Sequence, residues 1–181
     1  MEASVDKKSR YINLAIALCL ILVAIILRFL PHPANFAPVA AIAIFGGAIL
    51  PRRLALFVPV AIMVLSDMVL GFYNIMPVIW GCYLFIALAS FTWLRKPNIK
   101  RGLAVTLSGS VLFFVVTNFA VWLWTGMYAH TIAGLTQCYW LAIPFFRNTL
   151  LSDLIYTGAL FGLYQLATSA VAKKLLAPSR D

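Results

Sequence analysis

The sequence predicts an all-α membrane protein with six transmembrane helices and both termini in the cytoplasm. Of its 181 residues, 64% are hydrophobic and only 10% are charged, which is far less charge than a soluble domain of this length carries. Several separate apolar runs approach or exceed the roughly 20 residues that a helix needs to cross a bilayer. The basic residues gather in alternate connections between these runs. We therefore expect a single integral membrane domain over residues 1–181.

The first apolar run follows "KKSRY" and superficially resembles a secretory signal. No small-residue cleavage site follows it and more spans come after, so we expect a retained first helix. The second run is short at about 14 residues and contains Pro38, Gly46 and Gly47. We expect it to be tilted, broken or buried among its neighbours, which tolerate irregular backbone that lipid does not. The predicted helices are 11–30, 37–50, 54–72, 77–94, 102–124 and 149–172.

The connection between the last two predicted helices is about 24 residues long, whereas the other connections have three to eight. It is rich in Tyr and Trp, and Pro144 interrupts its segment "YWLAIPFFRN". Trp and Tyr favour the headgroup level of a bilayer, so part of the connection is expected to form an interfacial helix. The same segment is suited to act as a lid over a large, flat ligand. The two interpretations are compatible.

Basic residues set the predicted orientation. Arg28 and Arg147 alone fall on one side of the membrane under this layout. The positive-inside rule therefore places the other side, with both termini, in the cytoplasm. It also accounts for the net charge of +9, so no nucleic-acid partner is expected. The twelve basic residues on the cytoplasmic side are Lys7, Lys8, Arg10, Arg52, Arg53, Arg95, Lys96, Lys100, Arg101, Lys173, Lys174 and Arg180.

The remaining polar residues gather on the outer side or in the outer third of the membrane. Asp67 and Asp153 are the only acids away from the termini. They favour either of two arrangements: ion pairs with Arg28 or Arg147 that clamp helix ends, or a polar cavity that opens outward between the helices. An ionisable group within a span normally faces a partner, the bundle interior or a water-filled cavity. Clustering on one side favours the cavity, because helix clamps would occur on both faces.

The three cysteines occupy different settings. Cys19 lies among Leu and Ile in the first helix and is expected to fill the core, whereas Cys138 lies in the outer connection, where exposure or oxidation is expected. Cys82 lies about five residues into the fourth helix, roughly 7–8 Å below its outer end. A thiolate prefers soft metals, but one cysteine does not build a zinc or copper site. One cysteine would suffice for a metal that arrives already held by an organic ligand. The alternative is that Cys82 only packs against its apolar neighbours.

The stretch "RFLPHPANFAPVAAIAIFGGA", followed by "LSDMVLGFYN" and the fourth-helix cysteine, resembles a family of vitamin transport subunits. These are the S components of energy-coupling-factor transporters, and in particular the BtuM-like solitary subunits for vitamin B12. The resemblance covers nearly the whole chain in span number and topology. It implies an S-component-like bundle in the bacterial inner membrane that takes up cobalamin, with Cys82 supplying sulfur to cobalt. The implied cavity residues are His32, Asn35, Asp67, Tyr83, Tyr139 and Arg147.

Thiolate donation from Cys82 would also labilise the opposite axial ligand, so the resemblance implies loss of cyanide from cyanocobalamin as a secondary activity. The first helix has Ala15-xxx-Cys19 where docking subunits carry Ala-xxx-Ala, which fits a subunit that acts alone. The chain contains no "GxxxxGK[ST]" loop, so it has no ATP site, and any ATP-driven step would need an energy-coupling module. The alternatives are an S component for another small nutrient and a membrane scaffold without a substrate.

Overall fold

The computed structural model describes the backbone of residues 2–95 and 98–176 and the side chains from residue 9 to 174 within these ranges. The described residues form helices joined by short connections and contain no strand, which confirms the predicted all-α class. The six helices are α1 (Glu2–Phe29), α2 (Val39–Ile49), α3 (Arg52–Leu70), α4 (Met76–Trp93), α5 (Ile99–Trp124) and α6 (Ile132–Leu176).

The short helix α2 is the centre of the bundle. Ten of its 11 residues are buried, and it packs against each of the other five helices. A helix of this length rises about 16 Å, roughly half the thickness of a bilayer's hydrocarbon core. The other five helices are long and apolar enough to cross a membrane. The expectation that the second helix is buried among its neighbours is confirmed.

Glycine allows α2 to approach α4 closely. A Cβ atom at Gly47 would lie 2.5 Å from the carbonyl oxygen of Ala87 and 2.8 Å from the Cβ of Ser90. The hydroxyl of Ser90 donates a hydrogen bond to the carbonyl oxygen of Ile44, across the same contact. Any larger residue at position 47 would force these two backbones apart, because interiors of this density leave no room for an extra methyl group.

The prediction for the last helix is wrong at its start. A helix was expected from residue 149 after a 24-residue connection, but α6 begins at Ile132 and the true connection is 125–131. Pro144 lies inside α6 without ending it. A proline removes one helical hydrogen bond, and membrane helices tolerate this where neighbouring groups satisfy the freed carbonyl. Helix α1 likewise begins at Glu2 instead of residue 11, because no Gly or Pro stops it there.

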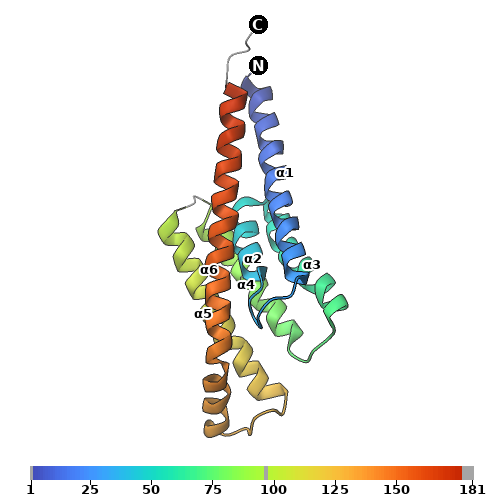
Figure 1. Cartoon of the computed structure of the whole chain (residues 1–181), viewed down its shortest axis with the longest axis vertical. Coiled ribbons are helices and arrows are strands. Elements are labelled where there is room, and N and C mark those ends of the chain that lie inside the picture. The colour runs from blue at the N-terminus through green and yellow to red at the C-terminus, as the bar shows by residue number, and fades with distance from the viewer. Residues whose placement is uncertain (1, 96–97, 177–181) are drawn as a thin grey trace.

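The start of α1 and the end of α6 lie at the same end of the molecule, where the two helices run side by side (Figure 1). We call this the basic end, and the end that carries connections 30–38, 71–75 and 125–131 the opposite end. The side chains of Lys7, Lys8, Lys96 and Arg180 lie outside the described residues. The described and exposed basic residues of the basic end are Arg10, Arg52, Arg53, Arg95, Lys100, Arg101, Lys173 and Lys174.

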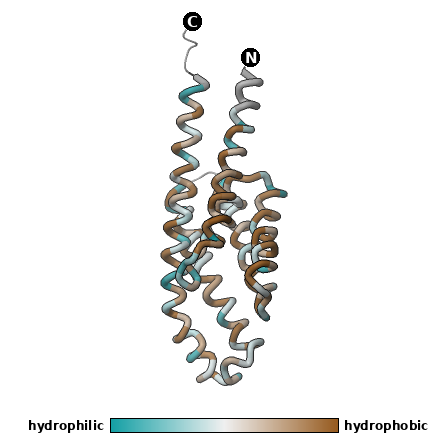
Figure 2. The backbone as a smooth tube through the Cα atoms, turned by 45° about the vertical axis from the view of Figure 1, so that its right-hand side comes forward, coloured by the Kyte–Doolittle hydropathy of each residue, from teal (hydrophilic) through white to brown (hydrophobic). Residues whose placement is uncertain are grey.

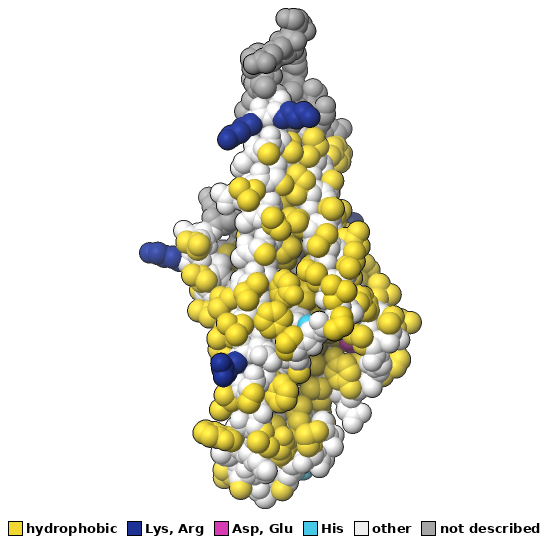
Figure 3. All heavy atoms as spheres, viewed as in Figure 1, with side chains coloured by type: hydrophobic (Ala, Val, Ile, Leu, Met, Phe, Trp, Pro, Cys, Tyr) yellow, Lys and Arg dark blue, Asp and Glu magenta, His cyan; other side chains and the backbone are white. Residues whose placement is uncertain are grey.

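The flanks of the bundle are apolar. Hydrophobic residues dominate the tube through the middle of the molecule (Figure 2), and hydrophobic side chains cover much of the visible surface between the charged ones (Figure 3). Large apolar side chains such as Leu22, Phe57 and Phe85 are more than half exposed. A water-soluble protein rarely exposes apolar patches of this extent. The chain is therefore a multi-pass membrane protein.

Candidate functional site

Arg28 and Asp67 form a salt bridge at the opposite end of the bundle. Arg28 lies in the last turn of α1 and Asp67 in the last turns of α3, and Arg28 Nη2 is 3.1 Å from Asp67 Oδ1. The side chain of Asp67 is 1% exposed and that of Arg28 is 11% exposed. The sequence left open whether Asp67 would pair with Arg28 or Arg147, and the structure selects Arg28.

Further donors fill the remaining positions around this pair. The indole Nε1 of Trp80 donates to Asp67 Oδ2 at 2.8 Å, and the hydroxyl of Tyr73 donates to the same oxygen at 3.5 Å. Arg28 Nε donates to Ser66 Oγ at 2.9 Å. We call Arg28, Ser66, Asp67, Tyr73 and Trp80 the Asp67 cluster. It joins α1, α3, connection 71–75 and α4, so it fixes how these elements meet at the opposite end.

Tyr73 is the member of the Asp67 cluster most open to solvent. Burial and the neighbouring carboxylate of Asp67 raise the pKa of Tyr73 to about 12, because both disfavour a second negative charge there. The phenol therefore stays neutral and keeps its proton as a hydrogen-bond donor at physiological pH. Its one O–H is directed at Asp67 Oδ2, and because Tyr73 is 39% exposed, the phenol oxygen can accept a hydrogen bond from a solute that approaches from the opposite end.

Cys82 faces the interior of the bundle. It shares one face of α4 with Ile86 and Ser90, which follow it at spacings of four residues. Ile86 lies against Gly109 of α5, and Ser90 is hydrogen-bonded to α2. The thiol therefore points toward the other helices and away from lipid, but only 4% of Cys82 is exposed. Neighbouring side chains would have to move before a metal could reach the sulfur.

Tyr83 follows Cys82 and turns toward α5. Its ring stacks on Phe113, with ring centroids 5.3 Å apart and planes inclined by 30°. Tyr83 is half-buried beside the apolar cluster that includes Ile86 and Ala87. Tyr83 thus lies in the contact between α4 and α5, and both Cys82 and Tyr83 lie within one turn of Trp80 in the Asp67 cluster.

Two other predicted residues lie in the connection 30–38. His32 is exposed, and its Nε2 lies 3.2 Å from the carbonyl oxygen of Arg28. Asn35 is also exposed and adopts a positive φ of 60°, which Asn tolerates better than most residues. Asn148 Nδ2 donates to the carbonyl oxygen of Ala34 at 3.0 Å, so α6 holds this connection in place. His32 therefore lies beside the Asp67 cluster, because its ring contacts the backbone carbonyl of Arg28, a member of that cluster.

The remaining two predicted residues lie on α6. The hydroxyl of Tyr139 donates to the carbonyl oxygen of Val115 at 2.7 Å, which ties α6 to α5. Arg147 is exposed and makes no salt bridge among the described residues. The alternative in which Arg147 pairs with an acid is therefore wrong for the described residues. Within the described part of the chain, neither Tyr139 nor Arg147 is hydrogen-bonded to the Asp67 cluster.

Asp153 has a different environment from the one expected. It is 3% exposed, and its Oδ2 accepts a hydrogen bond from Ser110 Oγ of α5 at 2.6 Å. No basic side chain lies within salt-bridge distance of it in the described residues. The sequence signal was a set of hydroxyl residues at helical spacings on α5 and α6. The buried members of that set are Thr106, Ser110, Thr117, Thr149, Ser152 and Thr157.

The other two cysteines reverse their predicted settings. Cys19 is exposed on α1, so it does not fill the core. Cys138 is 2% exposed, and its thiol donates to the carbonyl oxygen of Asn118 at 3.4 Å. The reason is that residues 132–148 are helical and pack against the end of α5. Without that packing, Cys138 would lie in an open connection.

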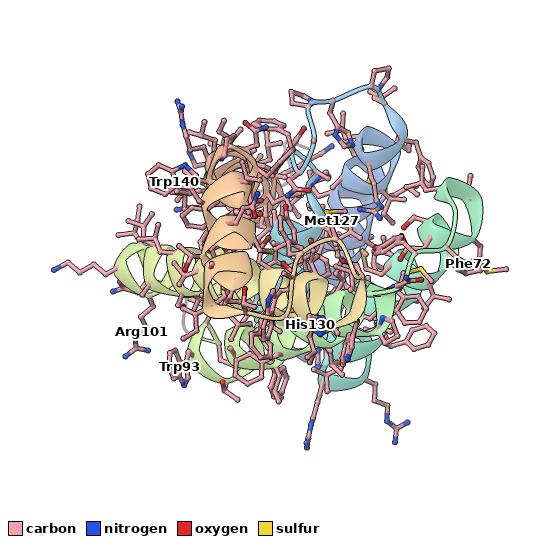
Figure 4. The ribbon with its side chains drawn as sticks, turned by 90° about the horizontal axis from the view of Figure 1, so that it is seen from below. Phe72, Trp93, Arg101, Met127, His130 and Trp140 are labelled. Atoms are coloured by element: carbon pink, nitrogen blue, oxygen red, sulfur yellow. The ribbon has the colours of Figure 1, made fainter. Side chains whose placement is uncertain are left out.

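The ends of α5 and α6 form a helical hairpin at the opposite end. The ring of Phe114 lies 4.7 Å from that of Phe146, which packs the two helices together. Viewed from the opposite end, connection 125–131 with Met127 and His130 projects over the centre of the bundle, whereas Phe72 and Trp140 point to its periphery (Figure 4). The connection predicted as an interfacial helix or a lid is thus mostly part of α6.

Three cavities lie near the basic end. Their volumes are about 860, 580 and 550 Å³. The first lies at the start of α3 beside Arg52 and Phe57, and the second lies between Arg10, Arg95 and Tyr164. The third separates α5 from α6 and extends along α6 from Leu154 to Thr168. The predicted site at Cys82 and Asp67 therefore lies at the other end of the bundle from these cavities.

Comparison with known proteins gives a family but no named relative. The family of unknown function DUF6580 matches residues 8–175. No curated protein and no solved structure matches the chain. Because the match covers more than half of the chain, this protein belongs to the family DUF6580.

Proposed function

We propose that this protein takes up cobalamin across the bacterial inner membrane, with Cys82 as a ligand to cobalt. The observation that carries the proposal is the inward orientation of Cys82, on a helix that also contributes Trp80 to the Asp67 cluster. The resemblance of the sequence to S components for vitamin B12 supports the same substrate. Binding would occur at the opposite end, and the positive-inside rule would place the basic end in the cytoplasm.

The chemistry of Cys82 suits a metal that is already held by a macrocycle. A thiolate is a soft donor, and a corrin leaves one axial position of cobalt for a protein ligand. The apolar neighbours of Cys82, including Tyr83 and Ile86, would face the corrin ring. Exposed polar groups at the opposite end, among them His32, Asn35 and Tyr73, would bind its amide side chains.

Binding requires the opposite end to open, because Cys82 is 4% exposed in this arrangement. The connection 30–38 is the segment placed to move. It is held to α6 by the bond from Asn148 to Ala34 and by a bond of 2.9 Å from Ser152 Oγ to the carbonyl oxygen of Ala37. Weakening these two bonds would free the connection without touching Cys82.

The test uses the absorbance spectrum of cobalamin mixed with the purified protein. Wild-type protein is expected to bind cobalamin and to shift its spectrum, because sulfur replaces the axial base on cobalt. The variant Cys82→Ala should lose this shift, whereas the matched variant Cys19→Ala should keep it, since Cys19 is exposed on the outside of α1. Unchanged binding and an unchanged spectrum in Cys82→Ala would remove the sulfur from the mechanism.

The second candidate is uptake of a different small nutrient, recognised at the Asp67 cluster. The near-complete burial of Cys82 favours it, because a buried cysteine commonly serves as a small apolar residue. A panel of vitamins tested by thermal shift separates the two candidates. Stabilisation by another nutrient, equal in wild type and Cys82→Ala, would select the second. A scaffold without a substrate predicts no stabilisation by any of them.

A further inference from the structure

Asp153 is a buried acid with no cationic partner. It is 3% exposed, and in the described residues the salt bridge at Asp67 is the only one. Its single side-chain hydrogen bond comes from Ser110, a neutral donor. An unpaired carboxylate in a membrane interior is strongly unfavourable, so such a group normally binds a proton or a cation. Asp67 is the contrasting case in the same bundle, because Arg28 forms a salt bridge with it and Trp80 donates a hydrogen bond to it.

A second polar group is left without a partner one turn away. Thr157 follows Asp153 by four residues on α6 and is 7% exposed. Its Oγ1 is buried and has no hydrogen-bond partner. Buried hydroxyls in helices usually donate to a carbonyl oxygen in the preceding turn, as Thr149 does to Phe145. A water molecule that entered beside Asp153 would supply the hydrogen-bond partner that this hydroxyl lacks.

The cavity between α5 and α6 leads from the basic end to these two residues. It has a volume of about 550 Å³, and its lining extends from Asn98 and Thr168 near the basic end to Leu154 and Thr157. From Leu154 to Thr168 the cavity follows α6 for about 21 Å. Thr106 also lines it, and its carbonyl oxygen lies 3.0 Å from Oγ of Ser110, the residue that is hydrogen-bonded to Asp153. The cavity thus stops within one turn of Asp153.

From the opposite end Asp153 is covered. Ser152, its neighbour, is fully buried and is bonded to the carbonyl oxygen of Ala37, and Asn148 is bonded to that of Ala34. These bonds hold the connection 30–38 over this part of α6. Asp153 therefore lies between a connection held over it at the opposite end and a cavity whose lining extends toward the basic end.

We propose that Asp153 is a proton-binding site, reached from the basic end through the cavity between α5 and α6. In this arrangement the carboxyl is neutral. Loss of its proton would leave an uncompensated charge between the helices and favour their separation. Proton binding and closure of α5 on α6 are thereby linked. The residues of this proton site all belong to this chain. The proposal therefore does not depend on which solute the protein carries.

The other titratable groups near Asp153 do not supply a counter-charge. Helix α2 has no titratable residue, and the titratable side chains of α4, Cys82 and Tyr83, are not cationic. On α1, Arg28 is held by Asp67. On α6, Tyr156 packs against Phe36 and Arg147 is exposed. Helix α5 presents hydroxyl groups.

Infrared spectroscopy tests the proton directly. The whole chain has five Asp and Glu residues, so few signals compete. At about pH 7, roughly three units above the ordinary Asp pKa of about 3.9, wild-type protein in lipid should show the carbonyl band of a protonated carboxylic acid. Asp153→Asn should lose this band, and Asp67→Asn should keep it. Absence of the band in wild type, or its persistence in Asp153→Asn, would overturn the proposal.

The route is tested by exchange of that proton for deuterium. A Cβ at Gly158 would meet open space in the cavity wall, so Gly158→Leu should fill the cavity without displacing the backbone. It should slow the exchange of the Asp153 proton several-fold. Gly81 is also in open space but lies on α4, away from the cavity, so Gly81→Leu should leave the rate unchanged. Equal rates in all three proteins would exclude access through this cavity.

Both measurements use the protein without any solute. A failed cobalamin experiment therefore leaves the proton site standing, and a missing carboxylic-acid band leaves the cobalamin proposal standing. If the band is absent and sodium ions raise the melting temperature of wild type but not of Asp153→Asn, Asp153 binds a metal cation and the proton assignment is wrong. Because Asn is nearly the same size as Asp and can accept from Ser110, the variant should retain the fold.

Discussion

Arg28 Nη2 and Asp67 Oδ1 lie 3.1 Å apart, and this contact joins the last turn of α1 to the end of α3. The two residues are 39 positions apart in the sequence. Each charge makes the burial of the other tolerable, because an isolated charge at this depth would be strongly unfavourable. The pair therefore sets the geometry of the end where the solute is proposed to enter.

Arg28→Gln should destabilise the protein by about 3–5 kcal/mol, because it leaves the buried carboxylate of Asp67 without its cation. Reversible unfolding in detergent measures the change. The control is Arg147→Gln, which alters an exposed arginine without a salt bridge among the described residues and should shift stability by no more than about 0.5 kcal/mol. Similar losses in both variants would mean that the salt bridge contributes little.

Trp80→Phe should cost about 1.5–3 kcal/mol, because it removes the indole donor that bonds Asp67 Oδ2 at 2.8 Å. Trp140→Phe is the matched control, since Trp140 is 72% exposed. The same unfolding measurement applies. If Trp80→Phe is as mild as Trp140→Phe, the hydrogen bond to Asp67 is replaced by water or is not formed in solution.

Tyr73 should titrate late. Burial and Asp67 raise its pKa to about 12. An ordinary tyrosine titrates near pH 10, so the tyrosinate absorbance of Tyr73 should appear about two pH units higher. The folded state holds this proton more tightly than the unfolded state. Its contribution to stability is therefore complete below about pH 10 and is lost as the pH rises toward 12. The effect on stability is small, because Tyr73 is 39% exposed.

The measurement is the difference in absorbance between wild type and Tyr73→Phe across this pH range. Asp67→Asn should move the titration of Tyr73 to lower pH, because it removes both the charge and the oxygen that accepts from the phenol. A Tyr73 titration near pH 10 in wild type would show that the phenol is not held in the Asp67 cluster.

Gly47→Ala should destabilise the protein by about 1–3 kcal/mol, because its methyl group would overlap the backbone of Ala87 on α4. Gly81→Ala provides the contrast. Nothing lies within 4 Å of a Cβ at that position, so the better helix propensity of Ala should make this variant neutral or slightly more stable. Equal effects of the two substitutions would contradict the close approach of α2 and α4.

Sequence patterns located the first five helices well. Every end of these helices was predicted to within a few residues, except the start of α1. Long apolar runs are local signals, since each residue contributes separately to transfer into lipid. The start of α6 was missed because Pro144 and the Tyr- and Trp-rich segment indicate a connection by local rules. Tertiary packing against α5, through Phe114, Cys138 and Tyr139, keeps that segment helical.

The candidate site was predicted in part. The sequence identified Asp67, Arg28 and Cys82 as unusual for a membrane span, because their polarity or chemistry stands out among apolar neighbours. It did not identify Trp80 as the partner of Asp67, since one indole among many aromatic residues carries no distinguishing signal. One of its two alternatives gave each acid an ion pair, whereas Asp153 is bonded to Ser110 and has no salt bridge among the described residues.

The sequence by itself determined that the chain is a helical membrane protein and which of its connections are basic, because hydropathy and charge are properties of single residues. Only the tertiary structure decided which buried acid has a cation. Arg28 and Asp67 meet because the ends of α1 and α3 lie side by side, while Asp153 faces hydroxyl groups across the contact between α5 and α6. Such pairings depend on helix packing over long sequence separations, which residue-by-residue patterns do not encode.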